Sequence, residues 1–132
     1  MGRVYNKLTK AQRTAYNYAL TYPENEVRIE ALRDNRRAIR YDTDKVQTSP
    51  DDPMFSLMVQ LTRLTTRNAN IDDALLEVFG SYGNTALQMA KEMLCYGRRM
   101  AEVEAKHGHL PMGHNEYYRK RREFWTSLSE RI

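Results

Sequence analysis

The sequence is poor in cysteine, proline and glycine, and it contains no long hydrophobic run. Cys95 is its single cysteine, so no disulfide forms within the chain, and we expect a reducing, cytoplasmic setting. No apolar stretch approaches the roughly 20 residues that a membrane span requires. The first residues also lack the apolar segment of a signal peptide. The sequence therefore predicts no membrane partner.

The usual signatures of enzymes and cofactor sites are missing as well. The glycines of GSYG (80–83) have neither the lysine nor the preceding strand of a phosphate-binding loop. The aspartate pairs at 51–52 and 72–73 are explained by helix capping and by a solvated helix face. Four potential zinc ligands have a spacing that fits no standard zinc finger: Cys95, His107, His109 and His114. We expect no catalytic activity, no cofactor and no metal.

Basic residues concentrate towards the two ends of the chain, which carries a net charge of +4. Residues 1–40 hold nine Lys or Arg against four Asp or Glu, and residues 91–132 hold nine against six. Residues 41–90 hold three against seven. This distribution favours nucleic acid as the partner of one part of the molecule and protein as the partner of another.

Hydrophobic residues recur with helical spacing along nearly the whole chain, so we expect an all-α protein. Thr9 and Gln12 have the spacing of a capping box, which predicts a helix that begins there and stops before Pro23. A second helix follows over residues 24–40. Its arginines are candidates for contacts with a nucleic-acid backbone or for a solvated face: Arg33, Arg36, Arg37 and Arg40.

A long central helix is predicted over residues 53–79, with Asp52 as its N-cap and Pro53 in its first turn. Its seam repeats at spacings of three and four residues, which is a heptad pattern. The seam consists of Met54, Leu57, Leu61, Leu64, Asn68, Ile71, Leu75 and Val78.

This seam has two interpretations: it packs against other helices of the same chain, or it pairs with a second copy. The polar residue Asn68 favours the second interpretation. A polar residue on such a seam costs stability and specifies register and partner number. We therefore expect a homodimer whose association surface is formed by Leu57, Leu61, Leu64, Asn68, Ile71 and Leu75.

The last third of the chain has the elements of a helix-turn-helix. Short helices are predicted over 84–97 and 98–108, and a longer basic helix runs over about 114–130. Tyr117, Phe124, Leu128 and Ile132 are expected to pack inward, with Arg121 extended along the same stripe. The outer face then carries the candidate DNA-binding residues Asn115, Glu116, Tyr118, Arg119, Lys120 and Arg122.

The run of four bases at 119–122 favours duplex DNA as the partner, because phosphates alongside would relieve the repulsion between neighbouring charges. We expect Asn115 to pair with adenine and Arg119 with guanine, and Tyr118 to donate to a phosphate. A solvated basic helix is the plainer interpretation of the same run.

Three segments resemble the pattern of the ArpU/RinA family of phage late-gene transcriptional regulators. They are MGHNEYYRKRREFWTSL (112–128), ALTYPENEVRIEALRDNRRAI (19–39) and TSPDDP (48–53), the last followed by the long central helix. The resemblance implies a small helical protein whose C-terminal helix-turn-helix is similar to sigma-factor region 4. The DNA-facing positions that it implies are Asn115, Glu116, Tyr118, Arg119 and Arg122. Gly113 stands where the family usually has a capping serine.

These observations favour a phage-type DNA-binding transcriptional regulator that acts in the host cytoplasm. It would have an association region over residues 1–83 and a DNA-binding region over residues 84–132. A protein–protein adapter that docks on host RNA polymerase or on another phage protein is the main alternative. A DNA-packaging oligomer similar to a small terminase is the third.

Overall fold

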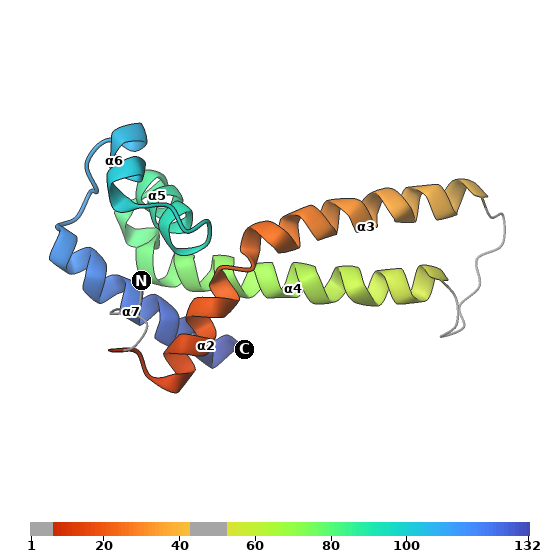
Figure 1. Cartoon of the computed structure of the whole chain (residues 1–132), viewed down its shortest axis with the longest axis horizontal. Helices are drawn as coiled ribbons and strands as arrows, with labels where there is room; N and C mark the ends of the chain where they lie inside the picture. The colour runs from red at the N-terminus through yellow and green to blue at the C-terminus, as the bar shows by residue number, and fades with distance from the viewer. Residues whose placement is uncertain (1–6, 43–52) are drawn as a thin grey trace. The chain divides into compact units, whose positions relative to one another are not determined.

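The structure, a computed structural model, describes residues 7–42 and 53–132, and the regular structure within these ranges is helical throughout. This confirms the all-α fold. Figure 1 labels α2 (Lys10–Ala19), α3 (Tyr22–Asp42), α4 (Pro53–Phe79), the 3₁₀ helix η1 (Gly80–Tyr82), α5 (Asn84–Leu94), α6 (Met100–His107) and α7 (His114–Arg131). Asp52, the expected cap of α4, lies outside the described residues. Among the helices of the described ranges, none combines the length and the apolar character that crossing a membrane requires.

Two compact units make up the chain. Unit 1 comprises residues 1–23 and 70–132, and unit 2 comprises residues 24–69. Both boundaries fall inside helices, so α3 and α4 each contribute to both units. This division differs from the one expected at residue 84, because α2 and the end of α4 share a hydrophobic core with the C-terminal helices.

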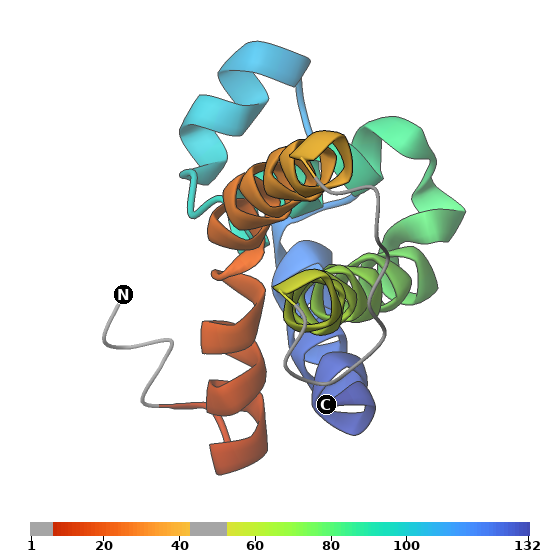
Figure 2. The same ribbon diagram turned by 90° about the vertical axis from the view of Figure 1, so that its right-hand side faces the viewer.

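In unit 1, α2 lies against α7, as Figures 1 and 2 both show. The predicted capping box is present at the start of α2, where Thr9 and Gln12 each accept a hydrogen bond from the other's backbone N–H. The Gln12 amide also donates to the Thr126 hydroxyl of α7 over 3.1 Å. Further along, the rings of Tyr16 and Trp125 lie 5.4 Å apart. α2 thereby covers part of the C-terminal half of α7.

A polar cluster joins the start of α3, the middle of α4 and α5 within unit 1. The Tyr22 hydroxyl donates to Asp72 over 3.0 Å, and Lys91 donates to Tyr22 over 2.7 Å and to Asp72 over 3.2 Å. The Lys91 ammonium also lies 4.1 Å from the centre of the Tyr22 ring. Burial disfavours the ammonium form, but the hydrogen bonds to Tyr22 and Asp72 raise the pKa of Lys91 overall.

In unit 2, α3 and α4 run antiparallel to each other (Figure 1). Ile29 of α3 is buried together with Leu61 and Leu64 of α4 in a small apolar cluster. Next to the apolar contacts, the Asn25 amide donates a buried hydrogen bond of 2.9 Å to the side-chain oxygen of Asn68. The two helices therefore meet through both apolar and polar side chains.

The heptad seam of α4, which was expected to form an association surface, is buried within the single chain. Six side chains were expected to face a second copy, and each is at most 8% exposed in the single chain: Leu57, Leu61, Leu64, Asn68, Ile71 and Leu75. Ile71 and Leu75 belong to the core of unit 1. Asn25 supplies within the same chain the polar partner that Asn68 was expected to find in a dimer.

Candidate nucleic-acid interface

The turn that leads into α7 is held by side chains of α6 and by a glycine. Gly108 ends α6 with a φ of 90°, which residues with a side chain rarely adopt. Glu104 accepts a hydrogen bond of 3.0 Å from the backbone N–H of Leu110, and its other oxygen lies 3.1 Å from Nε2 of His114. The backbone hydrogen bond, followed by the contact with His114, lowers the pKa of Glu104. These contacts fix where α7 begins.

The inward face of α7 contains the predicted stripe and one further large side chain. Tyr117, Phe124 and Leu128 are buried, and burial raises the pKa of Tyr117. Trp125 is also buried, at 2% exposure, and it packs against α2. Ile132 was expected to pack inward but is 45% exposed. The buried side of α7 is therefore broader than a single heptad stripe.

Four of the six candidate DNA-binding residues are exposed in the first three turns of α7: Asn115, Tyr118, Arg119 and Arg122. Their spacing of three and four residues places them on one face of the helix. Gly113 is the N-cap and has no side chain with which to accept a hydrogen bond. The first backbone N–H groups of α7 therefore have no side-chain cap.

The other two candidates, Glu116 and Lys120, are half-buried and have partners within the chain. The hydroxyl of Tyr82 in η1 donates to Glu116 over 2.7 Å, and the same carboxylate oxygen lies 3.6 Å from the Arg119 guanidinium. Lys120 forms an ion pair of 3.0 Å with Glu123, whose hydrogen bond raises the pKa of Lys120. Glu116 and Lys120 are thus held by contacts within the chain and are not part of the exposed face.

Arg121 lies against aromatic rings instead of extending into solvent. Its guanidinium carbon is 4.6 Å from the centre of the Tyr118 ring and 5.6 Å from the centre of the Trp125 ring. This is cation–π geometry for both rings. Arg121 therefore links the exposed face of α7, where Tyr118 is 41% exposed, to the buried face that contains Trp125.

The second half of the exposed face of α7 has charges of both signs. Glu123 and Glu130 line a shallow groove together with Glu77 of α4, and Arg119 and Arg122 line the same groove. Ser127 and Arg131 donate hydrogen bonds to Glu77 and lower its pKa. The exposed basic side chains that are not interleaved with carboxylates therefore lie in the first half of α7.

α5 and α6 are joined by a buried carboxylate that the sequence analysis did not single out. The Glu92 side chain is 1% exposed, and it accepts a hydrogen bond of 3.2 Å from Lys106 and contacts Arg98 and His107 closely. Burial opposes ionisation, but hydrogen bonds from His107, Lys106 and Arg98 offset it, so the pKa of Glu92 is lowered.

The remaining candidates are the arginines of α3 and the residues considered as zinc ligands. The arginines of α3 belong to unit 2, where Arg37 forms an ion pair of 3.0 Å with Asp34. Of the residues once considered as zinc ligands, Cys95 is buried and His107 contacts Glu92. In the part of the chain that the structure describes, no three His, Cys, Asp or Glu side chains are grouped so as to hold a metal ion.

No family model, curated protein or solved structure matches the chain.

Proposed function

We propose that the chain is a DNA-binding transcriptional regulator of phage type in which α5, α6 and α7 act as a helix-turn-helix. The observation that carries this proposal is the division of α7 into a buried aromatic side and an exposed polar, basic side. The first turns of a recognition helix reach the base edges in the major groove. Asn115, Tyr118, Arg119 and Arg122 are exposed in this part of α7. The resemblance of residues 112–128 to the ArpU/RinA pattern supports the same assignment.

The side chains suit distinct roles on a duplex. The Asn115 amide fits the edge of adenine, and the Arg119 guanidinium fits the edge of guanine. Arg122 and Tyr118 suit phosphate oxygens, as do the uncapped N–H groups at the start of α7. Glu116, held by Tyr82, would orient Arg119 through their 3.6 Å contact.

We infer that two copies of the chain bind one DNA site together, with α7 of each copy contacting one of two half-sites. One small reader buries on the order of 600–1,000 Å², which limits its affinity and selectivity, and a second reader raises the effective concentration. The α4 seam is occupied within the chain, so pairing requires another surface. An exposed apolar surface for such pairing is present on α4 in unit 2. It consists of Phe55, Met58 and Val59, which are 47%, 37% and 44% exposed.

The same apolar side chains favour a second candidate function, an adapter that docks on another protein such as host RNA polymerase. Exposed apolar clusters commonly mark protein contacts. Sedimentation separates self-pairing from adapter function. If Phe55→Ser and Val59→Ser convert a dimer into a monomer, the surface pairs two copies. A parent protein that is already monomeric favours the adapter.

The test of DNA reading begins with selection of a preferred site from random duplexes, followed by binding titrations over a range of salt. Arg122→Gln is expected to weaken all duplexes similarly and to lower the salt slope by about one. Asn115→Ala and Arg119→Gln are expected to cost about 1–3 kcal/mol on the preferred site and less on other sites. Arg63→Gln, on the exposed side of α4 in unit 2, is the control with the same change of charge.

Two outcomes contradict the proposal. Absence of salt-dependent duplex binding by the intact chain at low salt removes it altogether. Equal losses for Arg119→Gln and Arg63→Gln would show that net charge, and not the face of α7, determines binding.

A further inference from the structure

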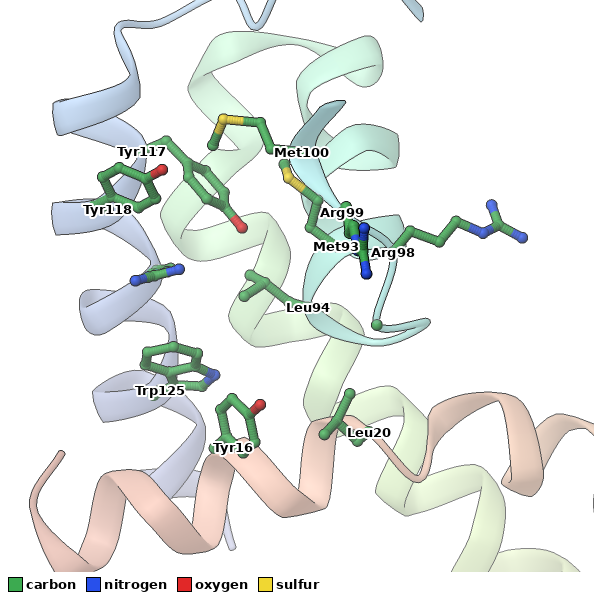
Figure 3. Close-up of a pocket in the computed structure, with 12 residues that line it drawn as sticks. Tyr16, Leu20, Met93, Leu94, Arg98, Arg99, Met100, Tyr117, Tyr118 and Trp125 are labelled. Carbon is green, nitrogen blue, oxygen red and sulfur yellow. The ribbon is translucent and has the colours of Figure 1, made fainter. Parts of the chain in front are cut away.

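A cavity of about 350 Å³ opens in unit 1 beside the buried side of α7. Figure 3 shows it between α7, the end of α2 and the connection from α5 to α6. Its lining includes Leu20 at the C-cap of α2, Met93 and Leu94 of α5, and Trp125 of α7. The size is at the lower end of the range for small-molecule sites, about 300–1,000 Å³, and the mostly apolar lining is typical of them.

Two buried nitrogen donors at this cavity have no acceptor in the part of the chain that the structure describes. They are Nε1 of Trp125 and Nε of Arg121. In Figure 3 the indole nitrogen of Trp125 lies on the side of the ring that faces the other labelled residues. A buried N–H group without an acceptor is unfavourable, because it has lost its hydrogen bond to water. A ligand that offers an acceptor at this point would recover that free energy.

The charged residues that line the cavity determine which charge a ligand should carry. Arg98, Arg99 and Arg121 line the cavity, and no carboxylate is among its described lining residues. Arg98 is engaged with the buried Glu92. Arg121 is held in place by its contacts with the rings of Tyr118 and Trp125, so its donor has a defined position. The local charge therefore favours an anion.

Arg121 and Trp125 are neighbours beside the cavity, since the Arg121 guanidinium carbon is 5.6 Å from the centre of the Trp125 ring. A carboxylate held there would leave the rest of the ligand facing Leu94, Met93 and Leu20.

We propose that this cavity binds a small organic anion, a carboxylate attached to an aromatic or aliphatic body. The Arg121 Nε–H and the Trp125 indole N–H donate to the carboxylate, and the apolar body packs against the apolar lining. Tyr118, one of the exposed DNA-binding candidates of α7, also lines the cavity, but the ligand is bound without any contribution from DNA.

The test compares each acid with its neutral amide, because the two differ in charge and hardly in shape. The probes are phenylacetate with phenylacetamide, and cyclohexylacetate with cyclohexylacetamide. Binding to the full chain is followed by calorimetry and by the fluorescence of Trp125, which is the single tryptophan of the chain. A charge-assisted hydrogen bond is worth about 1.5–3 kcal/mol, so the acids are expected to bind at least about tenfold more tightly than the amides.

Variants show whether the preference arises in the cavity. Arg121→Gln is expected to abolish the difference between acid and amide, and Arg63→Gln, with the same change of charge outside the cavity, is expected to retain it. Circular dichroism checks that Arg121→Gln stays folded, and Trp125→Phe, followed by calorimetry, is the second variant and is expected to weaken the acids. Equal affinities of acid and amide for the unmodified chain, binding of neither, or an acid preference that survives both variants would each overturn the proposal.

Discussion

The side-chain amide of Asn25 donates a hydrogen bond to the side-chain oxygen of Asn68, and both residues are buried. A polar position inside an apolar seam is expensive unless it is paired. The pair explains why Asn68 interrupts the heptad of α4 without requiring a second copy of the chain. It also fixes the register of α3 against α4 in unit 2, because a shift by one turn would separate the two amides.

Replacing only one member of this pair is expected to destabilise the protein. Asn68→Leu leaves the Asn25 amide buried without this partner, at a cost of about 1–3 kcal/mol in the free energy of unfolding. The double variant Asn25→Leu with Asn68→Leu is expected to recover most of the loss, because both polar groups are gone. Chemical denaturation of the four proteins of this cycle measures the coupling. Additive losses would show that the pair contributes nothing.

The same substitution at the two glycines that flank the turn before α7 is expected to have opposite effects. Gly113 has a φ of −66° and is the N-cap, so Gly113→Ser supplies a cap and gains about 0.5–1 kcal/mol. Gly108 has a φ of 90°, so Gly108→Ser costs about 1–3 kcal/mol in backbone strain. A Cβ meets nothing within 4 Å at either glycine, so crowding does not confuse the comparison. Thermal unfolding that changes in the same direction for both contradicts this account.

Glu92 is expected to make the protein sensitive to acid. Its pKa is lowered in the folded state, so its contribution to stability is present above the ordinary value of 4.5 and is lost as the pH falls through the folded-state pKa. Glu92→Gln weakens the hydrogen bonds from Lys106, Arg98 and His107 and is expected to cost about 1–2 kcal/mol at neutral pH. Unfolding measured against pH should show this difference shrinking in acid. Glu130→Gln, an exposed control, should match the parent protein throughout, and a constant difference for Glu92→Gln would contradict the prediction.

Tyr82→Phe tests whether η1 positions the proposed reader. The change removes the hydrogen bond to Glu116 but keeps the ring. We expect little change in thermal unfolding and a few-fold weaker binding to the preferred DNA site, because Glu116 no longer holds Arg119 in place. Tyr18→Phe is the matched control, since it removes a hydroxyl that contacts Asn70 instead. Equal effects of the two variants would show that the Tyr82 contact does not position the reader.

Local patterns predicted the helices well because capping and apolar periodicity act over a few residues. The Thr9–Gln12 capping box, the bounds of α4 and the start of α7 near His114 all follow from neighbouring residues. The exposed side of α7 was predictable for the same reason, since it follows from helical spacing.

Contacts between distant segments were not predictable in this way. The periodicity of α4 gives no indication of whether its partner is α3 or a second copy, and the Asn25–Asn68 pair spans 43 positions. Helical spacing places Glu116 on the exposed side of α7. Its carboxylate nevertheless accepts a hydrogen bond from Tyr82, which is 34 positions earlier. Trp125 adjoins the predicted stripe and is buried because α2 packs against it. The cavity beside Trp125 arises from these same contacts, so no local sequence motif predicts it.

The packing of α2 against α7 also has a consequence for the synthesis of the protein. Gln12 and Thr126, which join the two helices, are 114 positions apart. Ribosomes add about 5–20 residues per second, so on the order of ten seconds pass between the synthesis of α2 and the synthesis of α7. During that interval the ring of Tyr16 has no Trp125 to pack against. Docking of these two helices is therefore a late step in folding, in contrast to the local contacts that let most helical proteins fold quickly.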